Sequence, residues 1–179
     1  ILVDNLPFGA NGFYLPFDPN AVGVNYSQYL TSAKPFASGN PTWYAFNSNT
    51  GEVAATEADS GATEANAIVF TPPGAGISYG KSVEGWFRTP ATDANGVASI
   101  NDGTAVSGTL GQWNTIATGS GKLTKLKAWI SGGTVGENYL GGIKIDGKML
   151  VDYNNIGVDA SGNNNNFYDG QCFAVGNTS

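Results

Sequence analysis

The side chains that could perform chemistry are few in this sequence. It contains no histidine and a single cysteine, which excludes the Ser-His-Asp triad, the Cys-His dyad and the common histidine-containing zinc sites. Cys172 lies in an apolar run, where a small buried side chain is a more frequent role than a reactive thiol. Two carboxylates could still hydrolyse a glycosidic bond. Glu84 beside Trp86 is the best placed candidate, but an outward-facing charge on an amphipathic strand explains it equally well. We therefore predict that the chain is not an enzyme and assign no catalytic residue.

Hard oxygen ligands gather near the C-terminus, at Asp159, Asn163, Asn165 and Asp169. Calcium binds such oxygens, but the spacing lacks the glycine and the terminal glutamate of an EF-hand loop. Loops rich in Asn and Asp more often use these side chains to bond their own backbone. We therefore predict neither a metal site nor a cofactor.

Aromatic side chains offer the remaining chemistry, because the C–H faces of sugar rings pack on exposed aromatic rings. Most of the large aromatics are expected to fill the core instead, since each buries about 150 to 250 Å². Trp43 and Tyr44 directly follow Gly39-Asn40-Pro41, which indicates the edge of a loop. These two residues are the predicted carbohydrate-binding site. The residues assigned to the core are Phe46, Trp86, Phe87, Trp113 and Trp129.

The composition is typical of a strand-rich protein that turns often. Glycine (26) and proline (8) together make 34 of the 179 residues, whereas their usual combined share is about 12%. Charged residues make 12% of the chain, whereas about 25% is usual. With eight basic residues and a net charge of -6, the chain has nothing that would neutralise a run of phosphates, so nucleic acid is excluded as a partner. No apolar run approaches the length of a membrane span. Lys122, Lys125 and Lys127 are interpreted as one solvated strand face.

Short runs of β-branched and aromatic residues, separated by turn signals, predict an all-β fold. Asp146-Gly147 between two apolar runs favours a hairpin with a type I′ turn, and Asn101-Asp102-Gly103 indicates another hairpin whose glycine takes a positive φ. Residues 50–66 lack strand character and are expected to form a long loop or one short helix. The predicted fold is an antiparallel β-sandwich, jelly-roll-like in topology. The expected strands cover 68–70, 82–87, 97–100, 104–107, 112–118, 122–130, 143–145 and 148–151.

One internal similarity suggests that the chain comes from a tandem array. Ile1-Leu2-Val3-Asp4 is echoed by Met149-Leu150-Val151-Asp152, and a Gly/Asn-rich loop follows each copy. Because this spacing equals one domain, we predict that residues 1–18 are the end of a preceding hairpin and a linker. Residues 19–152 are then a β-sandwich module, and residues 153–179 are a linker and the start of a further repeat. The chain is accordingly expected to be a fragment of a longer protein.

Four runs of the sequence resemble repeated modules in large structural proteins of cyanobacterial phages. The resemblance covers most of the chain and is weakest between Ser32 and Ala67. Such modules occur in tail fibres, tail knobs and capsid decorations, and are similar to lectin-like or galactose-binding-like sandwiches without a motif that fixes sugar chemistry. This sequence departs from a complete member in lacking a natural start. The runs are Gly12–Asp18, Gln112–Gly121, Ile143–Asp152 and Gly157–Phe167.

The resemblance implies a structural or adhesive module on the surface of a bacteriophage virion, which assembles with other virion proteins, forms a homo-oligomer and contacts a host surface glycan. Two alternatives stay open: a carbohydrate-binding domain of a secreted bacterial protein, and a fragment of a polysaccharide depolymerase. Binding of glycans that is abolished by Trp43→Ala would favour the first alternative over a passive spacer, and turnover of host polysaccharide would indicate the second.

Overall fold

The computed structural model describes residues 24–57, 62–89, 93–133 and 136–152. Its compact unit runs from Asn25 to Asp152, and residues 1–23 and 153–179 lie outside the described residues. The predicted boundaries at residues 18 and 152, the echo at Ile1–Asp4 and the array therefore stay predictions.

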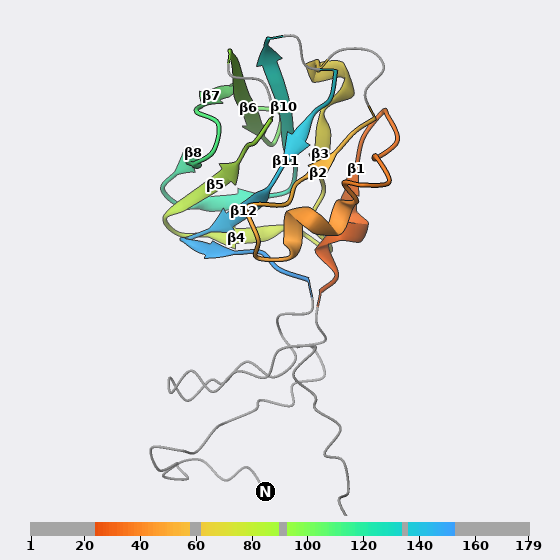
Figure 1. Cartoon of the computed structure of the whole chain (residues 1–179). Helices are drawn as coiled ribbons and strands as arrows, with labels where there is room; N and C mark the ends of the chain where they lie inside the picture. The colour runs from red at the N-terminus through yellow and green to blue at the C-terminus, as the bar shows by residue number, and fades with distance from the viewer. Residues whose placement is uncertain (1–23, 58–61, 90–92, 134–135, 153–179) are drawn as a thin grey trace, which may run out of the picture. The chain divides into compact units, whose positions relative to one another are not determined.

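The described unit is an all-β antiparallel sandwich, as predicted (Figure 1). Every strand pairing in it is antiparallel. One sheet has five strands in the order β1 (Leu30–Thr31), β3 (Ile68–Phe70), β10 (Leu126–Gly132), β6 (Ala94–Ile100) and β7 (Val106–Gly108). The other has four strands in the order β13 (Lys148–Met149), β12 (Gly142–Ile145), β5 (Ser82–Trp86) and β8 (Trp113–Thr118).

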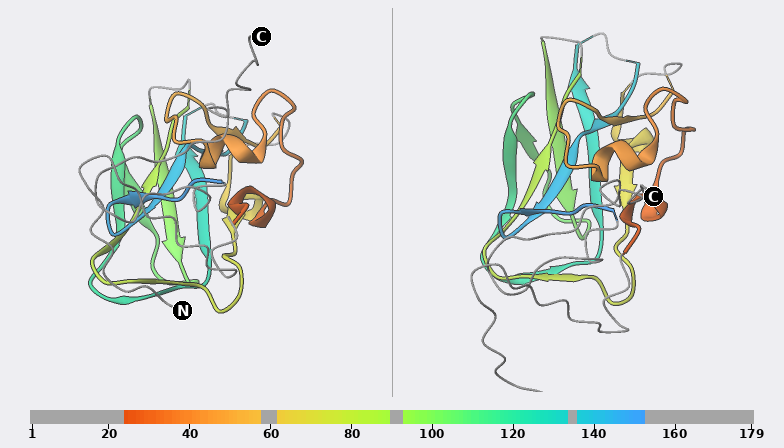
Figure 2. Two further views of the ribbon diagram at one scale, coloured as in Figure 1. Left: turned by 90° about the horizontal axis from the view of Figure 1, so that it is seen from below. Right: turned by 60° about the horizontal axis from the view of Figure 1, so that its bottom comes forward.

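Two short ribbons and three 3₁₀ turns complete the described residues. The ribbons pair β11 (Tyr139–Leu140) with β2 (Ala54–Ala55) and β4 (Ile77–Tyr79) with β9 (Gly121–Leu123). The second ribbon lies at the lower end of the coloured part of Figure 1, where the chain passes from one sheet to the other. The turns are η1 (Tyr26–Tyr29), η2 (Thr42–Phe46) and η3 (Glu64–Asn66). η1 and η2 pack together at one side of the sandwich (Figure 2).

The core lies between the two sheets, and one aromatic side chain shows how closely they approach. Phe87 is 1% exposed. A Cβ atom on Gly96 of β6 would lie 2.2 Å from the Cγ atom of Phe87, and one on Gly85 of β5 would lie 2.9 Å from its Cζ atom. The ring thus fills space that only glycine leaves free in each sheet. The other large, fully buried apolar side chains are Phe46, Phe70, Ile68, Leu123, Leu126, Ile130, Leu140, Ile143 and Val83.

The two predicted hairpins are present, but one turn differs from the prediction. Asp146 and Gly147 have φ of 53° and 81°, as a type I′ turn between β12 and β13 requires. β6 and β7 also pair, but there the positive φ values belong to Asn101 (51°) and Asp102 (57°), and Gly103 has none. Asn and Asp tolerate this conformation better than other residues with a Cβ atom. A hydrogen bond from the Gly103 N–H to the Ile100 carbonyl closes the turn.

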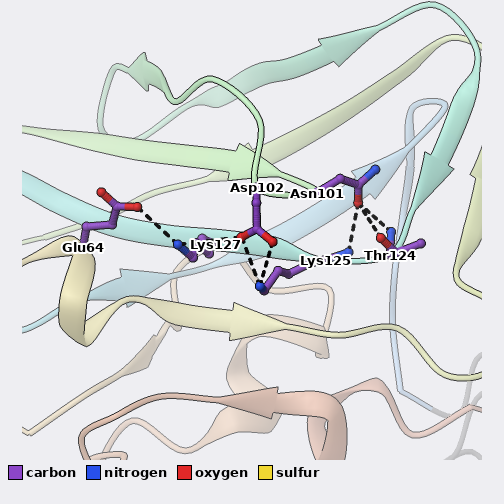
Figure 3. A network of polar contacts seen from close by, with 6 residues as sticks. All are labelled: Glu64, Asn101, Asp102, Thr124, Lys125 and Lys127. Atoms are coloured by element: carbon purple, nitrogen blue, oxygen red, sulfur yellow. Dashed lines mark hydrogen bonds and ion pairs between the residues drawn. The ribbon is translucent and has the colours of Figure 1, made fainter.

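The prediction of one strand over residues 122–130 was wrong, because the chain turns a corner at Thr124 and Lys125. β9 ends before this corner in a ribbon, and β10 begins after it in the five-stranded sheet. The Oδ1 atom of Asn101 accepts hydrogen bonds from the N–H groups of Thr124 (2.9 Å) and Lys125 (3.1 Å), as Figure 3 shows. A side chain from a distant turn thus holds the corner.

The lysines of this region form exposed ion pairs, in agreement with a solvated face. Lys125 contacts Asp102 at 2.9 Å, and Lys127 contacts Glu64 at 3.2 Å and Asp102 at 3.8 Å (Figure 3). The hydrogen bond from Lys125 lowers the pKa of Asp102. Exposed pairs of this kind contribute little to stability.

Residues 50–66 are neither a long loop throughout nor a single helix. They contain the two-residue strand β2 and the turn η3, separated by residues 58–61, which are outside the described residues. β2 forms because Ala54 and Ala55 are small enough to be buried completely, at 0% and 1% exposure, against β11.

Candidate functional site

Trp43 and Tyr44 lie where the sequence placed them, at the edge of the sandwich. Both belong to η2, which begins directly after Pro41. Trp43 is 48% exposed and is the only exposed aromatic side chain among the described residues. Its ring meets that of the half-buried Tyr44 edge to face, with the centroids 4.4 Å apart and the planes at 79°. The pair therefore offers an apolar surface to solvent beside a phenolic hydroxyl group.

The remainder of η2 explains why Trp43 stays exposed. Ala45 and Phe46, at the end of the turn, are 0% and 1% exposed and belong to the core. In a tight turn, burial of these two side chains leaves Trp43 to project away from the core. Phe46 packs against Phe70 and Tyr26, with centroid distances of 5.4 and 5.9 Å.

Hydrogen bonds connect the N- and C-terminal ends of the described unit to each other and to η2. The N–H of Asp152 donates a hydrogen bond to the Phe46 carbonyl (2.9 Å), and a carboxylate oxygen of Asp152 accepts one from the N–H of Ser27 (3.1 Å). Burial, and to a smaller extent the negative charge of Asp152, raise the pKa of Tyr26, so its hydroxyl group stays neutral. The aromatic pair is thus carried by a fixed support.

A loop rich in polar side chains follows η2. The N–H groups of Asn49 and Gly51 donate to the side-chain oxygens of Asn47 and Asn49, each at 2.9 Å. Asn47 also donates to the carboxylate of Glu52, and the guanidinium of Arg88 donates to the Gly51 carbonyl. These contacts fix the loop that follows the aromatic pair along the chain, and its amide and carboxylate groups and the Arg88 guanidinium group are at least partly exposed.

The structure divides the other predicted aromatics into two groups. Phe46, Phe87 and Trp129 are buried, as predicted. Trp86 and Trp113 are half-buried on the outer face of the four-stranded sheet, where they are neighbours with ring centroids 5.6 Å apart. The prediction that Trp86 and Trp113 belong to the core was therefore wrong. The alternation of Glu84 and Trp86 along one strand was the signal that both side chains share a face.

Of the weaker candidates from the sequence, only Glu84 lies among the described residues. Glu84 is half-buried and accepts a hydrogen bond from the Ser82 hydroxyl group (3.1 Å). The described residues contain no group of three or more acidic, Cys or His residues that could hold a metal. Cys172 and the oxygen-rich segment 159–169 lie outside the described residues. No helix in the described part of the chain is long and apolar enough to cross a membrane.

The side chain of Asp146 connects the turn between β12 and β13 to the start of β5. Its carboxylate accepts hydrogen bonds from three main-chain N–H groups, at Gly80 (2.8 Å), Lys81 (2.7 Å) and Ser82 (3.0 Å). These hydrogen bonds lower the pKa of Asp146, and the bond from Gly80 has the largest effect. The turn between β12 and β13 is thereby fastened to the start of β5.

Comparisons with known proteins place similar structures among carbohydrate-binding modules of Clostridium perfringens. No protein-family model matches the sequence, and no curated protein matches it significantly. CpGH89CBM32-5, in complex with GalNAc-beta-1,3-galactose, is 14% identical at a TM-score of 0.44 and covers 68% of this chain and 98% of its own. The family 32 module of NanJ, in complex with galactose, is 13% identical at a TM-score of 0.41, and the match covers 69% of this chain and 97% of that module. A module from a family 31 glycoside hydrolase is 13% identical at a TM-score of 0.45, and the match covers 72% of this chain and 99% of that module. These proteins are bacterial and none is a phage protein.

Proposed function

We propose that this chain is a non-catalytic glycan-binding module whose sugar platform is formed by Trp43 and Tyr44. The observation that carries the proposal is the 48% exposure of Trp43 on a turn whose next residues are buried. An exposed indole next to a second aromatic ring offers a flat apolar surface on which a ligand can pack. A pyranose ring suits such a partner because one side of it is a row of C–H groups.

Polar groups next to the platform supply the second requirement of sugar binding. A carbohydrate site needs a few fixed donors and acceptors beside its apolar surface. Tyr44 contributes a hydroxyl group, and the loop from Asn47 to Glu52 contributes side chains held in place by their mutual hydrogen bonds. Burial of Phe46 anchors the turn that carries Trp43 before the ligand arrives, which lowers the entropic cost of binding.

The experiment is a titration of the whole chain with neutral mono- and oligosaccharides by isothermal calorimetry, after a screen on a glycan array. Galactose is included because two of the similar structures contain a galactose ligand. We expect a dissociation constant on the order of 1 mM for a monosaccharide on one open platform. Trp43→Ala should weaken binding at least about tenfold, and Trp43→Phe, which keeps a ring, should lose less.

Val106→Ala is the matched control. Val106 is the other large apolar side chain that is exposed among the described residues, at 37%, and it lies on β7. Its truncation removes exposed apolar area elsewhere and should leave the affinity unchanged. Equal affinities of wild type and Trp43→Ala for every glycan bound would refute the platform, and absence of binding across the array would refute the function.

Membership of a bacteriophage particle, the location on a virion surface, the virion partners and the homo-oligomer stay predictions from the sequence. Glycan binding is compatible with that role, because many weak sites on one particle bind together far more tightly than one site alone. Mass spectrometry of purified particles would test it, since the predicted role requires peptides of this chain in the virion.

A further inference from the structure

The outer face of the four-stranded sheet carries an indole that reaches across the middle strand of three neighbouring strands. Gly142 of β12, Trp86 of β5 and Trp113 of β8 stand in one row. A Cβ atom on Gly142 would lie 2.9 Å from Cη2 of Trp113 and 2.7 Å from the methyl group of Met149. Because β5 separates β8 from β12, the side chain of Trp113 must cross β5 to reach Gly142. The missing side chain of Gly142 makes room for it.

Opposite charges stand beside this indole in the next row of the same face. Lys144 of β12 and Glu84 of β5 are directly opposite each other, and such neighbours have Cβ atoms about 4.5 to 5.5 Å apart. The Lys144 Nζ atom lies 4.1 Å from the centroid of the Trp113 ring. Neither residue takes part in an ion pair within the described residues. The Lys144 ammonium and the carboxylate oxygen of Glu84 that Ser82 does not bond are therefore open to a ligand.

We propose that this face is a second glycan site, in which a neutral hexopyranose packs on Trp113 while Glu84 accepts and Lys144 donates hydrogen bonds to its hydroxyl groups. The inference rests on the proposed glycan-binding function but uses other residues. Sugar hydroxyl groups are both donors and acceptors, so an adjacent cation and carboxylate satisfy a neutral sugar. An anionic sugar would instead meet the negative charge of Glu84.

Lys144 must leave the face of the indole when the sugar arrives. A cation–π contact that is open to water is weak, and a lysine side chain has a flexible four-carbon stem. The ammonium can therefore swing to the rim of the ring, where it meets the hydroxyl groups. The site is thus already covered in the free protein, which keeps the indole from being an exposed apolar patch.

The strands that flank this face do not favour a second copy as its occupant. The edge strand β13 has two residues. The other edge strand, β8, is interrupted by a bulge opposite Val83 and Glu84. Short and bulged edges disfavour pairing between sheets of neighbouring molecules.

The test uses the full chain labelled with 5-fluorotryptophan. Its four tryptophans give four ¹⁹F resonances, which single Trp→Phe variants assign. The probes are galactose, glucose, mannose and their neutral oligosaccharides, each raised to about 10 mM, ten times a dissociation constant of about 1 mM. We expect the Trp113 resonance to shift in the wild type and equally in Trp43→Ala, whereas the buried Trp129 resonance stays in place and reports an intact fold.

The variant Glu84→Ala should raise the dissociation constant that the Trp113 resonance reports at least about tenfold, equivalent to about 1.4 kcal/mol. The dissociation constant that the Trp43 resonance reports should stay unchanged. Lys148→Ala, on the exposed neighbouring strand β13, is the matched control and should change neither. Salt between about 0.05 and 0.5 M should have little effect, because a neutral ligand has no charge to screen.

Several results would overturn the second site. A Trp113 resonance that does not move while that of Trp43 saturates would leave the proposed function standing and remove this inference. A shift of Trp113 with uronate-containing sugars alone would show that the ligand is anionic. A shift with protein concentration in the absence of sugar would show that a second copy covers the face. A Trp113 resonance that titrates while that of Trp43 does not would refute the Trp43 platform instead.

Discussion

Replacing Asn138 by alanine should destabilise the fold more than replacing any exposed asparagine of the described unit. Asn138 is fully buried, and its side chain joins three segments. Its Oδ1 atom accepts a hydrogen bond from the N–H of Ile130 (2.9 Å), and its Nδ2 atom donates to the carbonyls of Asn66 (2.8 Å) and Thr63 (3.2 Å). Its backbone N–H donates to the Thr56 hydroxyl oxygen (3.0 Å).

The magnitude follows from which partners water can reach. Ile130 is fully buried, so its N–H would lose its partner, and an unpaired buried donor costs about 1 to 3 kcal/mol. Thr63 is exposed and Asn66 half-exposed, so their carbonyls can turn to water at smaller cost. With the small cavity added, we expect Asn138→Ala to lower the free energy of unfolding by about 2 to 4 kcal/mol.

Urea unfolding followed by tryptophan fluorescence measures this difference by linear extrapolation. Asn95→Ala is the control, because Asn95 is exposed on β6 and its replacement should stay within about 0.5 kcal/mol of wild type. A loss below about 1 kcal/mol for Asn138→Ala would mean that the Ile130 N–H finds another partner, and the reasoning from burial would fail.

Two further predictions concern the turn at Asp146 and the packing of Phe87. The three N–H donors hold the pKa of Asp146 below its ordinary value of 3.8, so its contribution to stability is complete above that value and is lost as the pH falls through the folded pKa. The difference in unfolding free energy between wild type and Asp146→Asn, measured by urea titration, should therefore shrink between about pH 5 and pH 2, and a constant difference would contradict the assignment. Gly96→Ala places a Cβ atom 2.2 Å from Phe87 and should cost about 1 to 3 kcal/mol or more by the same assay. Gly39→Ala, with no atom within 4 Å of its Cβ, should change stability by less than about 1 kcal/mol, and equal losses in the two variants would argue against steric overlap.

Local signals in the sequence were sufficient where the structure depends on neighbouring residues. The hairpin at Asp146-Gly147 was predictable because a type I′ turn needs two positive φ values, which this dipeptide adopts readily. The exposed position of Trp43 was predictable in the same way, because Gly39-Asn40-Pro41 ends one segment and a new turn begins after it. Both features involve residues that are adjacent along the chain.

Contacts between distant segments could not be predicted in this way. The corner at Thr124 depends on the side chain of Asn101, which approaches only after β6 and β10 have paired. The position of the Trp113 side chain depends on the absence of a side chain at Gly142, two strands away. Neither pairing leaves a pattern within a short window of sequence.

The sequence by itself determined the all-β class, the absence of histidine chemistry, two hairpins and the exposed position of Trp43, because composition and turn residues act over a few positions. The tertiary structure alone decided that Trp113, Glu84 and Lys144 share one face and that Asn138 joins three segments. The physical reason is that antiparallel pairing sets the register between strands far apart in the chain, and the register decides which side chains meet.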